Sequence, residues 1–179
     1  MSPTGSPIGV GIIGLSTSGW ASQAHVGGLA PLKGKIELKA LSTRSAESAE
    51  AAGRAHGVKA YHGDPSQIAN DPNVDLVVVA VNVGAHRDAV WPAIEAGKDV
   101  FVEWPLGVDY QEAREIADFA EQKGVRTMVG LQARQSPAVK KVKELVDNGS
   151  IGRVLSSSLV GRLADMHLTT LALTALNPL

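Results

Sequence analysis

Residues 8–20 of the chain read IGVGIIGLSTSGW. The stretch from Ile8 to Ile13 is a short apolar run, which is typical of a buried strand with helices on both of its faces. A glycine- and serine-rich segment follows at once, from Gly14 to Gly19, and residues 21–32 then carry small and apolar side chains at helical spacing. This order predicts a strand, a tight turn and a helix, which together begin a βαβ unit.

The rest of the chain continues the alternation of strand and helix. The predicted strands cover residues 8–13, 36–42, 75–81, 99–103 and 125–131, and the predicted helices cover 21–32, 46–56, 87–96, 110–123 and 136–148. The β-branched run DLVVVAV at 75–81 is expected in the middle of the sheet. The expected fold class is therefore α/β, a Rossmann-type doubly wound parallel sheet.

The domain boundaries follow from where this pattern begins and ends. Residues 1–7 are polar and turn-rich and are expected to be disordered, and residues 8–150 are expected to form the Rossmann domain. A new strand is predicted over 153–160, after which few residues remain and no charge follows His167. We therefore interpret residues 151–179 as the truncated start of a second, α+β domain.

Composition excludes several classes of function. The chain has 179 residues, no cysteine, and 17 Lys+Arg against 18 Asp+Glu, so its net charge of −1 argues against direct binding of nucleic acid or an anionic membrane. Without cysteine there is no disulfide scaffold or thiolate metal site. No signal peptide or transmembrane segment is evident, so a cytoplasmic or nuclear location is expected.

The turn after the first strand fits a dinucleotide-binding loop in one register only. A literal G-x-G-x-x-G pattern occurs at Gly9, Gly11 and Gly14, but it lies inside the predicted strand. Gly14, Ser16 and Gly19 instead fill the places of the tight turn, the close approach to pyrophosphate and the helix–strand contact. The alternative is an ordinary Gly/Ser turn. The candidate cofactor-binding residues of this loop are Gly14, Leu15, Ser16, Ser18, Gly19 and Trp20.

The end of the second strand bears on which dinucleotide would bind. An acidic residue there would hold the ribose 2′-hydroxyl of NAD(H), but the chain has Thr43 and Arg44 at this point. A guanidinium group with neighbouring hydroxyls suits a 2′-phosphate, so NADP(H) is favoured over NAD(H). The alternative is a solvated arginine at the start of a helix.

Polar side chains also follow the later strands, where the carboxyl edge of a parallel sheet lines a ligand crevice. Asn82 and His86 follow one strand, although a histidine at a helix start is as often a cap or a packing residue. No histidine or carboxylate cluster with metal-ligand spacing is present, and no G-x-S-x-G motif supports hydrolase chemistry. The remaining candidate cofactor-binding residues are Thr43, Arg44, Val81, Asn82, His86, Glu103, Trp104, Gln132 and Arg134.

Glu103, Trp104 and Pro105 stand at the end of the strand over 99–103, where a proline permits a tight or cis turn. Together with His86, Glu103 and Trp104 are candidates for the nicotinamide or substrate side of the crevice, although no residue is assigned as catalytic. Indole exchanges no proton near neutral pH, so Trp104 offers stacking or one donated hydrogen bond, and simple packing is the alternative.

Three separated motifs, Gly14 to Trp20, FVEWPL at 101–106 and LQARQSP at 131–137, resemble the glucose-fructose oxidoreductase / inositol dehydrogenase / MocA family. The resemblance extends over about 7–160, and these motifs are most similar to the regulatory branch of the family, the fungal repressors of galactose and lactose metabolism. The resemblance implies a bound dinucleotide and a C-terminal domain that supplies the substrate pocket and the oligomer interface. Family enzymes have Glu-Lys-Pro where this chain has Glu103, Trp104 and Pro105.

The resemblance leaves three functions open. The first is a catalytically impaired NADP(H)-binding regulator, whose implied partner is a transcriptional activator or a galactokinase-like protein. The second is an NADP-dependent oxidoreductase acting on a sugar or polyol, with Glu103, His86 and Arg134 in its site. The third is an inactive truncated remnant, in line with Ser16, Trp104 and the short C-terminal region.

Overall fold

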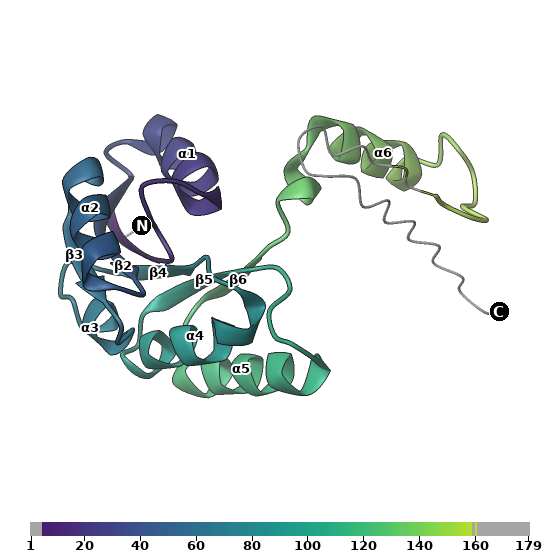
Figure 1. Cartoon of the computed structure of the whole chain (residues 1–179). Helices are drawn as coiled ribbons and strands as arrows, with labels where there is room; N and C mark the ends of the chain where they lie inside the picture. Colours follow the sequence, from purple (N-terminus) through teal and green to yellow (C-terminus); the bar gives the residue numbers. More distant parts are fainter. Residues whose placement is uncertain (1–4, 159, 161–179) are drawn as a thin grey trace. The chain divides into compact units, whose positions relative to one another are not determined.

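The computed structural model describes residues 5–158 and residue 160 (Figure 1). The chain divides into two compact units, with the division between Leu131 and Gln132. Residues 5–7 precede the first strand without regular structure. The predictions made for residues 1–4 and for the tail beyond residue 160 lie outside the described residues.

A six-stranded parallel sheet forms the centre of the first unit, in the order β3-β2-β1-β4-β5-β6. The strands are β1 (Ile8–Ile13), β2 (Ile36–Thr43), β3 (Lys59–His62), β4 (Leu76–Val79), β5 (Asp99–Glu103) and β6 (Thr127–Gly130). β4 lies between β1 and β5, so the expected central position of the β-branched run is confirmed. The predicted fold class, a Rossmann-type parallel α/β sheet, is also confirmed.

Helices cover both faces of this sheet (Figure 1). They are η1 (Ala21–Val26), α1 (Gly27–Leu29), η2 (Ala30–Leu32), α2 (Ala46–His56), α3 (Ser66–Ala69), η3 (Val83–Ala85), α4 (His86–Glu95) and α5 (Tyr110–Lys123), and η4 (Gln132–Gln135) and α6 (Pro137–Asp147) follow in the second unit.

The core lies in two layers because side chains alternate along each strand. Ile13 of β1 packs in one cluster with residues of α3, α4 and α5, whereas Val10 and Ile12 pack in the other with Ala21 of η1 and Ala52 of α2. All five of these side chains are buried. Burial on both faces explains why β1 is an uninterrupted run of apolar residues and glycine.

Three short elements of the first unit, β3, α3 and η3, were not predicted from the sequence. β3 and α3 have four residues each, and β3 is an edge strand whose residues KAYH are only partly buried or exposed. So short and polar a segment gives no hydrophobic period to recognise. The helix predicted over 21–32 has the expected extent, but it consists of a π-helical turn, a short α-helical turn and a 3-10 turn.

The prediction for the region after residue 150 is corrected by the structure. Residues 153–158 and residue 160 form no strand and are exposed, because the described chain offers no neighbouring strand to pair with their backbone groups. The helix expected over 136–148 is present as α6, and it lies in the second compact unit. None of its residues is buried.

An aromatic stack joins α4 to α5 on the first unit. The rings of Trp91 and Phe119 are 4.1 Å apart between centroids and nearly parallel, at 8°. The guanidinium of Arg87 lies 4.5 Å from the Trp91 ring, and Lys123 lies 5.4 Å from the Phe119 ring. Cations over the faces of stacked rings add an electrostatic attraction to the packing of the two helices.

A buried carboxylate holds β3 to the turn before β4. Asp71 is 3% exposed, and it accepts hydrogen bonds from the hydroxyl of Tyr61 at 2.8 Å and from the backbone and side-chain nitrogens of Asn73 at 2.9 and 3.1 Å. Burial opposes ionisation, but these bonds and the nearby charge of Lys59 outweigh it and lower the pKa of Asp71. The carboxylate is therefore a stabilising group only while it is ionised.

Replacing Tyr61 with phenylalanine should reduce the free energy of unfolding at pH 7 by about 1–2 kcal/mol, because a donor to this charged acceptor is lost. Since the pKa of Asp71 is lowered in the folded state, the stabilisation by its carboxylate is complete at pH values above the pKa of aspartate in the unfolded chain, roughly 4. It decreases as the pH falls through the lower folded value. Urea unfolding at pH 7 and at low pH measures both effects, and Tyr110→Phe, at a 79% exposed position, is the matched control. An equal loss in both variants would contradict this role.

Candidate functional site

The chain reverses direction at Gly14, between β1 and the loop that follows. Gly14 has a φ of +95°, and a Cβ atom placed there would lie 2.3 Å from the carbonyl oxygen of Ala80 at the end of β4. Its N–H donates to the carbonyl of Ser42 at 2.8 Å, so the turn is also fixed to β2. The predicted tight turn at Gly14 is confirmed, and only glycine fits it.

The two earlier glycines have a packing role inside β1. A Cβ atom at Gly9 would lie 1.9 Å from the carbonyl oxygen of Asn73, and one at Gly11 would lie 3.0 Å from the side chain of Ile68. The literal glycine pattern that begins at Gly9 is therefore part of the strand, as its position in the sequence indicated.

Gly19 is needed for a different reason from the one expected. Its φ is +112°, but the nearest atom to a Cβ placed there would be the hydroxyl oxygen of Ser16, at 3.8 Å. The expected close contact of helix and strand is thus absent at Gly19, and backbone conformation alone requires glycine there. Leu15, in contrast, is fully buried in the core and does not line the cavity described below, so the structure gives it a packing role.

The loop between these glycines presents backbone donors. Within the described residues, the N–H groups of Ser16, Thr17 and Ser18 have no acceptor. The hydroxyl of Ser16 donates to the carbonyl of Ser18, and the ring of His56 at the end of α2 donates to the carbonyl of Ser16 at 3.2 Å. Unpaired amides before the start of a helix are the groups that bind phosphate. No local pattern in the sequence indicated the His56 contact.

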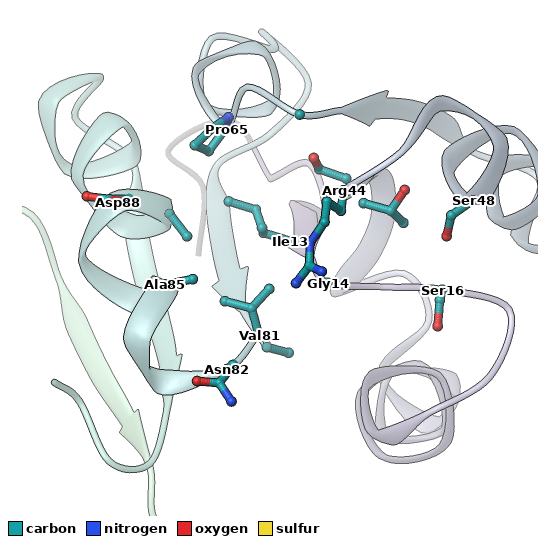
Figure 2. Close-up of a pocket in the computed structure, with 15 residues that line it drawn as sticks. Ile13, Gly14, Ser16, Arg44, Ser48, Pro65, Val81, Asn82, Ala85 and Asp88 are labelled. Atoms are coloured by element: carbon teal, nitrogen blue, oxygen red, sulfur yellow. The ribbon is translucent and has the colours of Figure 1, made fainter. Parts of the chain in front are cut away.

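A cavity of about 450 Å³ lies beside this loop, at the carboxyl ends of β1, β2 and β4 (Figure 2). Its walls include residues of the glycine loop, the end of β2, the loop after β3 and the first turns of η3 and α4. The predicted residues among them are Gly14, Ser16, Thr43, Arg44, Val81 and Asn82. The structure therefore brings together six candidates from three separate strand ends.

Arg44 is the cation of this cavity. Its side chain extends from the end of β2 toward Gly14 and Val81 (Figure 2). No carboxylate in the described part of the chain pairs with it. Asp88, on the opposite wall, is largely exposed to solvent.

The loop that carries Arg44 is fixed by local hydrogen bonds. Thr43 donates its hydroxyl to the carbonyl of Ser45 at 3.0 Å, and the side chain of Ser45 caps α2 by accepting from the N–H of Ser48 at 3.3 Å. Ser48 also lines the cavity. The cavity lining near the end of β2 therefore contains one guanidinium, that of Arg44, and three hydroxyl-bearing residues, Ser42, Thr43 and Ser48.

His86 is a packing residue in this structure. It is 1% exposed, and its ring nitrogens lie 3.0 Å from the carbonyl oxygens of Val81 and Pro105. The ring thus joins the ends of β4 and β5, where the peptide bond between Trp104 and Pro105 is cis. This geometry favours the packing alternative for His86 over contact with a ligand. The cis turn was one of the two conformations expected at Pro105.

Glu103 joins the end of β5 to the helix that follows the glycine loop. Its Oε1 accepts from the indole Nε1 of Trp20 at 3.3 Å and lies 2.7 Å from Nε2 of His25. The side chains of His25 and Glu103 are 16% and 15% exposed, and the His25 ring meets that of Phe101 edge-on. His25 was not among the candidates, because it is 78 residues away from Glu103 along the chain. Trp104 is 66% exposed.

Gln132 and Arg134 lie on η4, in the second compact unit. Their expected role at the cofactor therefore stays a prediction. Among the described residues, no group of three or more His, Asp and Glu side chains is arranged to hold a metal ion. No helix in residues 5–158 has both the length and the apolar character needed to cross a membrane.

Substituting alanine for Gly14 should reduce the free energy of unfolding by more than about 2 kcal/mol, because both the positive φ and the carbonyl of Ala80 oppose a side chain. Gly57 is the matched control: its φ is +66°, but a Cβ atom there would meet nothing within 4 Å. Gly57→Ala should therefore cost only about 1 kcal/mol. Denaturant unfolding compares the two variants, and equal losses would mean that the contact with Ala80 has no effect.

The family model described as an oxidoreductase family with an NAD-binding Rossmann fold, GFO_IDH_MocA, matches residues 8–131. The chain belongs to this family. The matched residues end where the first compact unit ends. An NAD-binding Rossmann family supports a dinucleotide as the cofactor of the cavity described above.

Relatives include both a named dehydrogenase and named regulators. The chain is 44% identical over 160 residues to dehydrogenase aclE of Aspergillus oryzae, covering 86% of this chain and 43% of that protein. It is 30% identical over 168 residues to the galactose/lactose metabolism regulatory protein GAL80 of Saccharomyces cerevisiae, covering 89% and 39%.

Solved structures agree with these relatives. The transcriptional regulator Gal80p from Kluyveromyces lactis superposes with a TM-score of 0.78 at 27% identity, covering 87% of this chain and 40% of that one. A super-repressor mutant of Gal80p from Saccharomyces cerevisiae superposes with a TM-score of 0.76 at 30% identity, covering 84% of this chain and 41% of that one. The chain thus spans about two fifths of the length of these proteins.

Proposed function

We propose that this chain binds NADP(H) in preference to NAD(H) in the cavity beside the glycine loop, and that it acts as a dinucleotide-binding regulator rather than as an enzyme. The observation that carries the first part is the unpaired guanidinium of Arg44, in a cavity that also contains Gly14 and Ser16 of the glycine loop.

The chemistry of the cavity supports a phosphorylated ribose. A 2′-phosphate offers charged oxygens to Arg44 and to the hydroxyl of Ser48, which lines the same cavity. A carboxylate at the end of β2 would instead accept from the 2′-hydroxyl of NAD(H) and repel the phosphate. Residues 42–45 read STRS, so no carboxylate stands there. The pyrophosphate would take the open amides of Ser16, Thr17 and Ser18.

The regulatory part of the proposal rests on Trp104. The enzymes that this chain resembles have lysine at this position, and an indole neither accepts nor releases a proton near neutral pH. The similarity to proteins named as regulators of galactose metabolism supports the same interpretation. The partner implied is a transcriptional activator or a galactokinase-like protein, recognised by a chain that holds its dinucleotide without consuming it.

A dehydrogenase is the second candidate, favoured by the 44% identity to a protein of that name. The pair of His25 and Glu103, 2.7 Å apart at the end of β5, could exchange a proton where Trp104 cannot. In such an enzyme a sugar or polyol hydroxyl gives its proton to the protein, and the carbon that bears it gives its hydride to NADP⁺.

Arg44→Gln should weaken the binding of NADPH about ten-fold or more, because a charge-assisted contact to phosphate is lost. The affinity for NADH, which lacks the 2′-phosphate, should change little. Isothermal titration of both dinucleotides measures this difference. Arg54→Gln is the matched control, since Arg54 lies on α2 and pairs with Glu50 at the surface. Equal affinity of the native chain for NADPH and NADH would contradict the preference, and no binding of either would support an inactive remnant.

Incubation of the chain with NADPH and ketoses, or with NADP⁺ and aldoses or polyols, should give no hydride transfer above the rate without protein, because Trp104 replaces the lysine of the Glu-Lys-Pro motif of the family enzymes. The absorbance of the reduced nicotinamide measures the rate. Trp104→Lys tests the same position by introducing the lysine that the family enzymes have there. Turnover by the native chain would exclude the regulator and support the dehydrogenase, and His25→Leu would then be expected to abolish it.

A further inference from the structure

The helix that follows the glycine loop begins without the usual local determinants. Trp20 precedes its first turn with helical backbone angles and provides no side-chain cap, and the first turn contains no acidic residue. The turn itself is π-helical, a conformation that is uncommon and that depends on its surroundings. The position of this helix start must therefore come from contacts with other parts of the molecule.

Two kinds of contact are present there. Leu15 and Ala21 are buried in the core on either side of the loop, which holds the backbone against the sheet. Glu103 makes the polar contact: its Oε1 accepts from Trp20 at the start of the turn and also lies within hydrogen-bond distance of His25 near its end. One carboxylate at the end of β5 thus holds both ends of the π-helical turn.

We infer that Glu103 is a positioning residue for the phosphate-binding loop. By holding Trp20 and His25, it fixes the helix start that follows residues 14–19, and so it restrains the loop that carries the unpaired amides of Ser16, Thr17 and Ser18. This inference rests on the proposed binding of a dinucleotide, and it gives Glu103 a role toward the phosphates.

The position of Glu103 at the end of β5 suggested a different role, contact with the nicotinamide or the substrate. The two roles differ in what they imply for a ligand without nicotinamide. A residue that contacts the nicotinamide ring contributes only to the binding of ligands that have this ring. A residue that positions the phosphate-binding loop contributes to the binding of every ligand that has the phosphates. The probe that separates them is 2′-phospho-ADP-ribose, which keeps the adenosine, the 2′-phosphate and the pyrophosphate but lacks the nicotinamide ring.

Glu103→Met removes both acceptor oxygens and keeps the length of the side chain. We expect it to weaken the binding of NADPH and of 2′-phospho-ADP-ribose by the same factor, about ten-fold, because two bonds to a partly buried charge are lost. Glu103→Gln keeps one acceptor oxygen and should restore most of the affinity for both ligands. Glu95→Gln, at an exposed position on α4, is the matched control.

His25→Leu provides a second variant that leaves Glu103 in place. It removes the shorter of the two contacts, and we again expect equal losses for the two ligands. A loss confined to NADPH in either variant would overturn the inference in favour of direct contact with nicotinamide. Unchanged affinity for both ligands in both variants would overturn it as well.

Hydrogen–deuterium exchange without ligand tests the inference independently of binding. The amides of residues 20–27 should exchange several-fold faster in Glu103→Met and His25→Leu than in the native chain, while those of α2 keep their rate. If the native chain binds neither ligand, the proposed function fails, and the exchange rates alone then decide whether Glu103 positions the loop. Unchanged exchange in residues 20–27 would refute the positioning role.

Discussion

The carboxyl edge of this sheet depends on the close approach of Gly14 to the carbonyl of Ala80. At that point β1 leaves the sheet beside β4, and the separation leaves no room for a side chain. The reversal leads into the glycine loop and then into the next helix, whose Ala21 packs with side chains of β1 and β2. The cavity, the open amides and the place of Arg44 all follow from this one constraint, because each is built on a strand end that the turn keeps accessible.

Two side chains then join strand ends that the backbone leaves separate. His86 lies between the carbonyls that follow β4 and β5, and Glu103 connects the end of β5 to the helix after the glycine loop. His86 and Val81 are close in sequence, but the contact of His86 with Pro105 and that of Glu103 with His25 join residues 19 and 78 positions apart. The edge is therefore a network of polar contacts over a core of aliphatic residues, in which Glu103 of β5 contacts the helix that follows the glycine loop.

Much of the fold could be predicted from the sequence because its signals are local. The bounds of α2 and α5 were correct, since Ser45 and Asp109 cap their first turns and Gly57 and Gly124 end them in left-handed conformation. β3 was missed because a four-residue edge strand carries no clear hydrophobic period. Six cofactor candidates meet at one cavity because parallel strands end at the same edge, but the contacts of His25 and His56 join residues 78 and 40 positions apart, and only the folded chain brings them together.

The distribution of tryptophan has an optical consequence. Trp91 is held in a stack with Phe119, whereas Trp20 and Trp104 are 60% and 66% exposed at the ends of the glycine loop and of β5. Indole emission responds to solvent and to polar neighbours, so two of the three tryptophans in this chain emit from solvent-exposed positions, and Trp20 has the carboxylate of Glu103 as a neighbour. A change in the contact between Trp20 and Glu103 would therefore alter the intrinsic fluorescence of the protein without any added label.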